Sequence, residues 1–325
     1  MTWTARNVVV TGAGGFIGSH LVERLLALGA NVTAFVRYNS RNDPGFLAAH
    51  TKDIRIVSGD IRDPEAVRSA LEGADTVFHL AALTGIPYSY VHPIEVFEVN
   101  AEGTLNVLVG ARDAGLRRVV ITSTSEVYGT ALYVPMDEKH PKQPQSPYSA
   151  SKISSDAIAL SFHSAFQLPV TVVRPFNTYG PRQSDRAIIP TIISQALTQS
   201  EITVGNTKPT RDFTYVSDTV EGFLCLASSD LTVGHEINLG TGREVSIGDL
   251  VQRINAIVGR DLPIRVQDKR VRPETSEVNR LLSNNSKARE LVGWTPRVTL
   301  DEGIRLTAKW VEERLEMYDP SVYRI

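Results

Sequence analysis

The sequence predicts an α/β fold in which helices cover both faces of a doubly wound parallel sheet, followed by a smaller C-terminal lobe. Through the first half of the 325 residues, short apolar runs rich in β-branched residues alternate with longer runs at helical spacing. A glycine-rich turn joins the first apolar run to the first helical run. This alternation is typical of a parallel sheet, because each strand needs a crossover, usually a helix, to reach the next.

Strands and helices can be assigned in order along the first half. The expected strands are residues 8–10, 32–36, 54–57, 76–80, 118–123 and 170–174. The expected helices are residues 18–28, 64–71, 93–113 and 147–166. Ligands bind beyond the carboxyl ends of the strands in such sheets. The residues that follow the apolar runs, and so should line a ligand site, are Asp60, Ala81, Ser123 and Pro175.

The turn after the first strand carries three glycines, Gly12, Gly15 and Gly18. In that position glycines allow a tight turn, close approach to a pyrophosphate and packing of the helix on the strand. The start of the following helix favours an anion. The strand, glycine turn and helix together predict a Rossmann domain that binds a dinucleotide.

The end of the second strand indicates which dinucleotide. An NAD site usually has an acidic residue there to bind the ribose 2′-hydroxyl. This sequence has none, and Arg37 and Arg41 occupy the region instead. Arginine suits a 2′-phosphate, so we expect NAD(P) with NADP favoured over NAD. The alternative is that both arginines are solvated and other groups hold the cofactor.

Beyond Gly180, proline, arginine and short mixed elements replace the regular alternation. We expect residues 1–180 to form the dinucleotide-binding domain and residues 181–325 to form mainly a substrate-binding lobe. The stretches 213–216 and 236–240 are expected to return to the first domain. The boundary between the two parts is therefore interleaved.

Composition excludes several classes of protein. A formal charge of −2 and a pI near 6.4 give no basic footprint for nucleic acid or a membrane surface. No segment reads as a signal peptide or a membrane span, and the single cysteine excludes a disulfide framework. We expect a cytoplasmic protein in which Cys225, in an apolar helical stretch, is a buried structural thiol.

A Tyr-x-x-x-Lys pair provides candidate catalytic groups. Tyr148 and Lys152 are four residues apart on an expected helix and so lie on one face, downstream of Thr124 and Glu126. A free phenol has a pKa of about 10, and a nearby ammonium favours the phenolate. The pair is therefore predicted to act as a base at neutral pH.

Several motifs carry a resemblance to a known family. They are the glycine turn, Asp60-Ile61, the His-Leu-Ala-Ala run at 79–82, the Tyr148/Lys152 pair and the Arg-Pro-Phe-Asn run at 174–177. Over nearly the whole chain they resemble the extended short-chain dehydrogenase/reductases that act on nucleotide sugars. The run at 123–129 resembles the 4,6-dehydratases. The runs at 82–90 and 174–183 are most similar to the bacterial branch acting on N-acetylglucosamine nucleotides in legionaminic-acid-type pathways.

The resemblance implies a set of site residues and no metal ion. The implied cofactor residues, besides the two arginines, are Gly12, Gly15, Phe16, Ile17, Gly18, Asp60, Ile61, Leu80, Ala81, Ala82, Asn100, Ser123, Tyr148, Lys152 and Pro175. The implied substrate residues are Tyr88, Ser89, Thr124, Asn177, Arg182, Arg211 and Arg272. Arg211 and Arg272 match arginines that approach the nucleotide diphosphate, and the alternative for each is a structural ion pair.

The implied reaction starts at C4 of a UDP- or GDP-linked N-acetylglucosamine or related hexose. Oxidation of C4 to a ketone makes the C5 proton acidic, so water can leave across C5 and C6, and hydride then returns to C6. Tyr148 would take the 4-hydroxyl proton, Lys152 would hold the phenolate, and Thr124 would bind O4. Glu126 would abstract the C5 proton.

One position departs from many dehydratases. An aspartate that protonates the leaving 6-hydroxyl usually precedes the glutamate, and here the residue is Ser125. Serine is too weak an acid to donate a proton outright. Two routes remain open: Glu126 shuttles its own proton to O6, or Ser125 positions a water molecule.

Other functions compete with dehydration. A UDP-glucuronate decarboxylase shares the C4 oxidation and the Thr-Ser-Glu run at 124–126. A nucleotide-sugar 4-epimerase needs no C5 base, which disfavours it. A regulator that binds dinucleotide without turnover is disfavoured by the intact set of Thr124, Tyr148 and Lys152.

A homodimer is expected through two helices of each subunit, residues 93–113 and 148–166. Their apolar residues are Val96, Val99, Gly103, Leu105, Val107, Leu108, Ile153, Ala157, Leu160 and Phe162. This is more apolar surface than contact with the sheet alone requires. Related enzymes pair these helices as a four-helix bundle, and a two-fold contact suits self-complementary faces.

Overall fold

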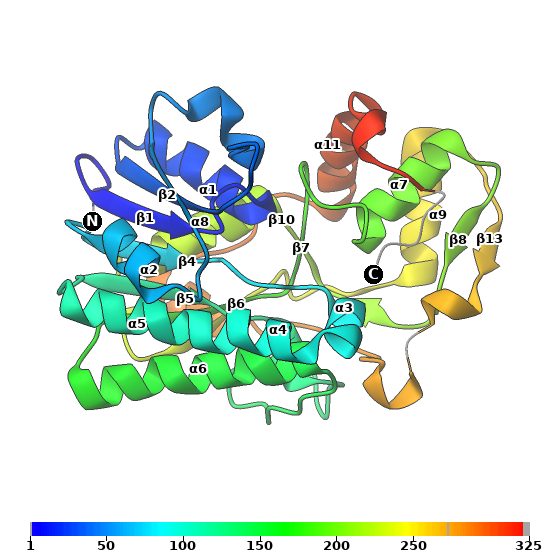
Figure 1. Ribbon diagram of the computed structural model, residues 1–325. Coiled ribbons are helices and arrows are strands. Elements are labelled where there is room, and N and C mark those ends of the chain that lie inside the picture. The colour runs from blue at the N-terminus through cyan, green and yellow to red at the C-terminus, as the bar shows by residue number, and fades with distance from the viewer. Residues whose placement is uncertain (1, 272, 321–325) are drawn as a thin grey trace.

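The computed structural model describes residues 2–271 and 273–320. Its centre is a seven-stranded sheet with strand order β11-β6-β5-β4-β1-β2-β3, in which every neighbouring pair is parallel (Figure 1). The strands are β1 Asn7–Thr11, β2 Asn31–Arg37, β3 Arg55–Gly59, β4 Thr76–His79, β5 Arg118–Thr122, β6 Val170–Pro175 and β11 Glu236–Leu239. The predicted α/β class is confirmed. The strand order reverses between β1 and β4, which is where such sheets bind ligands.

Helices pack on both faces of this sheet. On one face lie α1 (Phe16–Ala27) and α8 (Val216–Ala227), and on the other lie α2 (Pro64–Leu71), α5 (Gly103–Asp113) and α6 (Pro147–Phe166). The alternation along β1 explains the two layers, since Val8 and Val10 belong to one apolar core and Val9 to the other.

The single helix expected at residues 93–113 is three consecutive pieces. Helix α4 (Pro93–Phe97) runs into one π-helical turn, Glu98–Glu102, and then into α5. A short helix, α3 (Ile86–Val91), precedes them. Apolar spacing cannot reveal a π turn, because one extra residue in a turn leaves both flanking patterns helical.

The second lobe is built around α7 (Ile188–Thr198), α9 (Ile247–Val258) and α11 (Leu300–Glu312), seen beside the large sheet in Figure 1. Its small sheets pair β8 (Ile202–Val204) with β13 (Ile264–Val266) and β9 (Thr210–Arg211) with β12 (Val245–Ser246). Helix α10 (Ser286–Val292) instead packs against α8 and β11 of the first domain. The 3₁₀ turns of the chain are Gly45–His50, Ser125–Tyr128, Asp230–Thr232, Asp268–Arg270, Glu274–Ser276 and Leu315–Met317.

The chain passes back and forth between the two parts. Strand β11 adds to the edge of the central sheet beside β6. Strand β10 (Phe213–Tyr215) instead pairs with β7 (Asn177–Tyr179) in a separate two-stranded sheet. Within the described residues, no helix is both long and apolar enough to span a bilayer.

Candidate active site

The glycine turn has the shape that a pyrophosphate requires. Gly12 has a φ of +68°, and a Cβ there would lie 2.8 Å from the amide nitrogen of Ala81. A Cβ on Gly18 would lie 2.3 Å from the carbonyl oxygen of Gly12. Gly15 is exposed and caps α1, whose first turn carries neither a capping side chain nor an acidic residue. The amide groups at the start of α1 are therefore free of competing protein anions, so an NAD(P) pyrophosphate fits here.

A buried chain of hydrogen bonds fixes the loop after β4. The Thr11 hydroxyl accepts from the amide of Ala81 and from the amide before it, both at 3.1 Å, and lies 2.8 Å from Nδ1 of His79. Nε2 of His79 lies 3.1 Å from the Thr104 hydroxyl, which donates to the carbonyl oxygen of Asn100 at 2.5 Å. Since the Thr104 proton is committed, His79 must donate from Nε2 and accept from Thr11 at Nδ1. Burial lowers the pKa of His79 to about 3, so the ring is neutral.

Asn100 connects the loop after β4 to α6 through hydrogen bonds. Its side chain accepts from the amide of Leu83 at 2.8 Å and donates to the Leu83 carbonyl at 3.0 Å and the Ser151 hydroxyl at 2.9 Å. The residue is fully buried. The sequence predicted it as a cofactor residue, whereas the structure commits its polar atoms to the protein. Any effect on the cofactor passes through the loop at 80–83.

The Asp60 carboxylate is held by a neighbour. Arg62 donates to both its oxygens, from Nε at 3.0 Å and Nη2 at 2.7 Å, and also contacts Glu98 at 3.2 Å. Hydrogen bonding to Arg62 lowers the pKa of Asp60 to about 2. Ile61 beside it is buried against Gly103.

The arginines expected to select the cofactor lie at and beyond the end of β2. Arg37 and Arg41 are both exposed, Arg37 with 71% of its side chain accessible. A guanidinium nitrogen of Arg37 lies 3.9 Å from Glu95 of α4. Glu95 also accepts a 2.5 Å hydrogen bond from the Tyr88 hydroxyl. In the structure, therefore, α4 brings a carboxylate, that of Glu95, next to the end of β2, where the sequence itself has no acidic residue.

The Thr-Ser-Glu run lies on the 3₁₀ turn after β5. The Thr124 hydroxyl caps this turn by accepting from the amide of Glu126 at 3.2 Å. Ser125 and Tyr128 are buried, whereas Glu126 is partly exposed. Gly129 closes the turn with a φ of +65°, where a Cβ would lie 2.5 Å from the carbonyl oxygen of Gln143. The turn therefore buries its other side chains and leaves Glu126 partly exposed.

Tyr148 and Lys152 occupy the first turns of α6. A capping box of Ser146 and Ser149, together with a proline at the first position, starts this helix just before the tyrosine. Both side chains are nearly buried, and Nζ of Lys152 donates to the carbonyl oxygen of Thr122 at 2.5 Å.

The electrostatics of this pair differ from the expectation. Burial lowers the pKa of Lys152 to about 8. Burial also raises the pKa of Tyr148 above its ordinary value, with a contribution from Glu126, while a hydrogen bond with Thr124 acts in the opposite direction. The sequence predicted a phenol already tuned towards neutral pH by the ammonium. In the structure the ammonium binds Thr122 instead, so the phenol stays protonated.

The predicted substrate residues divide into two groups. The Oδ1 atom of Asn177 is buried without a hydrogen-bond partner, which suits a ligand contact. Ser89, in contrast, is fully buried and donates to the Ile86 carbonyl at 2.7 Å, so its side chain has no surface for a ligand. Arg182 donates to Ser19 at 3.1 Å and Glu23 at 2.7 Å, so its guanidinium binds α1 in this structure.

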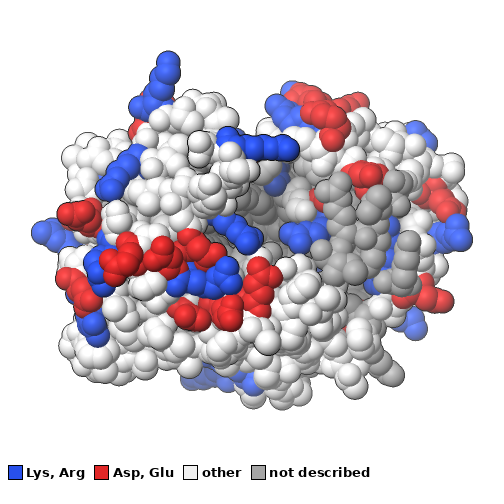
Figure 2. Space-filling model, viewed as in Figure 1, with Lys and Arg blue, Asp and Glu red and all other residues white. Residues whose placement is uncertain are grey.

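Two further arginines were predicted to approach the diphosphate of the substrate. Arg211 is nearly buried and contacts Glu277 at 3.4 Å. Arg272 lies outside the described residues. Figure 2 shows a hollow between the two lobes with Lys and Arg atoms inside it, so positive charge does face the space where an anionic substrate would enter.

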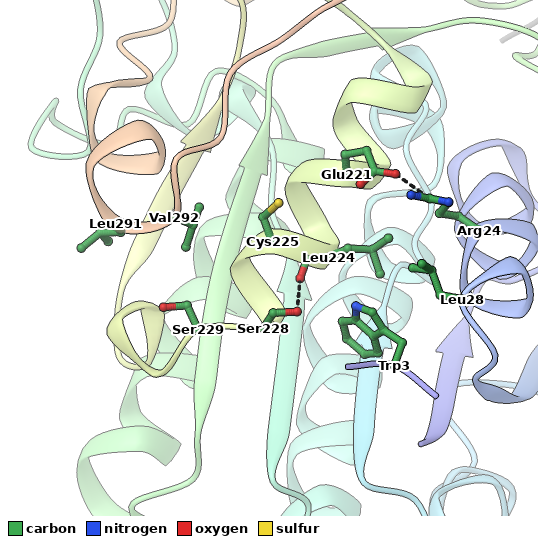
Figure 3. Close-up of a pocket in the computed structure, with 10 residues that line it drawn as sticks. All are labelled: Trp3, Arg24, Leu28, Glu221, Leu224, Cys225, Ser228, Ser229, Leu291 and Val292. Carbon is green, nitrogen blue, oxygen red and sulfur yellow. Dashed lines mark hydrogen bonds and ion pairs between the residues drawn. The ribbon is translucent and has the colours of Figure 1, made fainter. Parts of the chain in front are cut away.

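A pocket at the other end of the sheet is not part of this site. It has a volume of about 390 Å³ and lies between α1, α8 and α10, at the amino ends of the strands (Figure 3). Cys225 lines it and is half-buried, whereas the sequence predicted a buried thiol, and burial raises its pKa. Among the described residues, no group of three or more His, Cys, Asp and Glu side chains could hold a metal ion.

Comparisons with known proteins agree with the fold and the glycine turn. The model of the family described as GDP-mannose 4,6 dehydratase matches residues 9–307. A UDP-glucose 4-epimerase of Mycolicibacterium smegmatis is 35% identical over 315 residues, covering 95% of this chain and 99% of that protein.

Two solved structures are similarly close. The dTDP-glucose 4,6-dehydratase DesIV of Streptomyces venezuelae, with NAD and TYD bound, has a TM-score of 0.87 at 29% identity and covers 97% of this chain and 99% of its own. TunA, an NAD dependent NDP-hexosamine 5,6-dehydratase involved in tunicamycin biosynthesis, has a TM-score of 0.86 at 28% identity with the same coverage.

The parallel sheet, the glycine turn and the helix with its tyrosine and lysine define a dinucleotide-dependent enzyme of the short-chain dehydrogenase/reductase class. The chain belongs to the GDP-mannose 4,6-dehydratase family within the extended branch of that class. The family predicted from the motifs is therefore confirmed.

Proposed function

We propose that this enzyme is a nucleotide-sugar 4,6-dehydratase acting on a UDP- or GDP-linked N-acetylglucosamine or a related hexose. The observation that carries the proposal is the carboxylate of the partly exposed Glu126 on the turn that also holds Thr124. The charge of Glu126 also contributes to raising the pKa of Tyr148, so the carboxylate acts on the phenol that would begin the reaction. Elimination across C5 and C6 needs such a base, whereas inversion at C4 does not.

Each side chain has one task in this proposal. Thr124 hydrogen-bonds O4 and steadies the alkoxide as it forms. When the Lys152 ammonium turns from the Thr122 carbonyl towards the phenol oxygen, Tyr148 can release its own proton to solvent, and the phenolate then removes the 4-hydroxyl proton. Glu126 then removes the C5 proton, which the new C4 ketone has made acidic. The bound nicotinamide dinucleotide supplies the hydride acceptor and later the hydride donor.

The leaving 6-hydroxyl needs a proton, and we assign it to Glu126. The alternative, in which Ser125 positions a water molecule, is less well supported because only 3% of Ser125 is accessible. The carboxyl group that has just taken the C5 proton is already beside C6 and can pass that proton to O6. One residue then performs both halves of the elimination.

Relatives with other activities provide the competing hypotheses. The Mycolicibacterium smegmatis relative is described as a 4-epimerase, and a Bacillus cytotoxicus relative, 33% identical, as a UDP-N-acetyl-alpha-D-glucosaminuronate decarboxylase. All three reactions begin with oxidation at C4. Decarboxylases share the Thr-Ser-Glu run at 124–126, so Glu126 favours the dehydratase over the epimerase only. The run at 147–152 resembles that of dehydratases and favours the dehydratase over the decarboxylase.

For the cofactor, we expect NADP to bind more tightly than NAD through Arg37 and Arg41. A charge-assisted hydrogen bond contributes about 1.5–3 kcal/mol, which corresponds to a preference of about tenfold or more. Calorimetry on cofactor-free protein should show this preference and its loss in Arg37→Ala. Arg55→Ala, an exposed arginine that begins the adjacent strand β3, is the matched control. Equal or tighter binding of NAD by the wild type would refute the assignment, and would indicate that Glu95 supplies the missing acid.

We also propose a homodimer through α4, α5 and α6, which lie side by side on one outer face (Figure 1). The residues nominated from the sequence need correction, because Val96, Gly103, Val107, Leu108 and Phe162 are buried within the chain. The apolar side chains that remain exposed on α4 and α5 are Ile94 (74%), Phe97 (52%) and Leu105 (37%). They follow helical spacing and form one stripe.

Replacement of both Ile94 and Phe97 by glutamate should convert a dimer into a monomer, because four like charges would face one another across the two-fold axis. Light scattering at micromolar concentration measures the change. Leu132→Glu, at an exposed site away from these helices (63%), should leave the dimer intact. A monomeric wild-type protein with full activity would contradict the proposal.

A further inference from the structure

A buried carboxylate lies one helical turn beyond the catalytic lysine. Tyr148, Lys152 and Asp156 follow one another at intervals of four residues, so all three share a face of α6. Asp156 is fully buried. The mechanism above does not use it, and the motifs of the sequence did not single it out.

Asp156 binds the strand end that carries the active-site turn. Its Oδ2 atom accepts from the Ser123 hydroxyl at 2.9 Å, and Ser123 directly precedes Thr124. Lys152 binds the same strand end through the Thr122 carbonyl. The other oxygen of Asp156, Oδ1, is buried and has no hydrogen-bond partner. One oxygen of Asp156, Oδ1, therefore has no hydrogen bond, and it lies on the helix that also carries Lys152.

Arg174 of β6 completes the partners of Asp156. Its Nε and Nη2 atoms donate to Asp156 at 3.2 and 2.8 Å, and Nη1 donates to the Tyr128 hydroxyl at 2.8 Å. The same guanidinium contacts Glu236. Asp156 is thus held between β5 and β6, and it cannot move away from Lys152 without breaking a buried ion pair.

Asp156 is the carboxylate whose charge acts on Lys152, and other cations also lie near that carboxylate. Two cations lie near Asp156, namely Arg174 and Lys142, whose Nζ is 3.8 Å from Asp156 and 2.5 Å from Glu236. Tyr148 on the same helix and His79 on β4 are neutral, and the charge of Glu126 acts on Tyr148. Asp156 is therefore the carboxylate that Lys152 shares with the two other cations.

We propose that Asp156 is a positioning residue for hydride transfer: its carboxylate keeps Lys152 as an ammonium and holds Ser123, and hence Thr124, in register with Tyr148. The proposal rests on the proposed function for the roles of Tyr148 and Lys152. It predicts that the negative charge of Asp156, and not only its shape, sets the pH range over which the first half-reaction runs.

The direction of the effect follows from the required protonation state. Lys152 must carry its proton, which it loses as pH rises through its pKa. Burial lowers that pKa to about 8, and the charge of Asp156 is the influence that raises it. Without this charge the ammonium is lost at a lower pH. An opposite charge at short range changes a pKa by about one to three units, so the alkaline limb of activity should move down by about that amount.

The test compares Asp156→Asn with Glu236→Gln. Each variant removes one of the two carboxylates that contact Arg174 and leaves the other. Reduction of bound cofactor on mixing with a sugar nucleotide is followed against pH. The alkaline limb should move by at least about one pH unit in Asp156→Asn and stay in place in Glu236→Gln. An unmoved limb in both variants, or equal movement in both, would overturn the proposal.

A second readout needs no substrate, and it does not depend on Asp156→Asn being folded. In wild-type protein labelled at the lysine ε-carbons, NMR should show Lys152 titrating above neutral pH, with the resonance assigned by its absence in Lys152→Met. A neutral amine at pH 7 in the wild type would overturn the proposal even if Asp156→Asn does not fold. If no sugar nucleotide reduces the cofactor but Lys152 titrates at a lower pH in Asp156→Asn than in the wild type, the proposed function fails and the role of Asp156 in holding the ammonium stands.

Discussion

Replacement of Glu126 by glutamine is expected to abolish loss of water while leaving oxidation at C4 intact. Glutamine keeps the size and hydrogen-bonding shape of glutamate but cannot accept the C5 proton. Glu126 lies on a turn whose neighbours Ser125 and Tyr128 are buried, so the substitution changes a partly exposed side chain and leaves the turn in place. Rapid mixing with substrate should show cofactor reduction without 6-deoxy product.

The control for this variant is Glu72→Gln, which removes an exposed carboxylate elsewhere in the chain and should behave as the wild type. General base catalysis typically contributes about 10²–10⁴-fold, so dehydration should fall by at least that range. Dehydration by Glu126→Gln at the wild-type rate would show that another group removes the C5 proton.

Tyr148→Phe is expected to stop the reaction one step earlier, before any cofactor is reduced. Phenylalanine fills the same nearly buried space but has no hydroxyl to take the C4 proton. The loss should again be about 10²–10⁴-fold, now in the cofactor-reduction step itself. The two variants therefore separate the two halves of the mechanism: oxidation without elimination in Glu126→Gln, and no oxidation in Tyr148→Phe.

Tyr133→Phe is the matched control for the tyrosine, because that phenol is exposed and its hydroxyl bonds only Asp137 among the described contacts. Its stability and activity should be close to those of the wild type. Rapid cofactor reduction by Tyr148→Phe would remove Tyr148 from the role of base, whatever the final product.

The sequence predicted the strands of the sheet well because they are short apolar runs rich in β-branched residues. It also predicted where two of the helices begin. The helices at 64–71 and 147–166 begin at prolines preceded by polar caps, and the structure begins them at the same residues. The π turn at Glu98–Glu102 was not predicted, because its apolar residues keep a helical order while the backbone gains one residue in a turn. Residues 213–216 were predicted to return to the first domain, and the sequence did not indicate that β10 would pair with β7 in a separate sheet.

At the candidate site, motifs along the chain predicted some features and missed those that depend on the whole fold. Motifs identified the glycine turn and the Tyr148/Lys152 pair, since both depend on neighbours along the chain. Burial depends on the whole fold, and it reverses the expected tuning of the phenol and leaves the Ser89 side chain without an accessible surface. The contact of Arg37 with Glu95 could not be foreseen, because a helix distant in sequence supplies the acid. Asp156 could have been found from the interval of four residues alone.

Loss of water from a panel of sugar nucleotides tests the central claim most directly. The wild-type enzyme is incubated with UDP- and GDP-linked N-acetylglucosamine, the related hexoses and a uronate in deuterium oxide, and products are followed by mass spectrometry. We predict a product lighter by one water that contains solvent deuterium at C5. Glu126 has passed the original C5 proton to O6, so C5 must be reprotonated from solvent after hydride returns to C6. A product of unchanged mass with inverted C4, or loss of carbon dioxide from the uronate alone, would contradict the account.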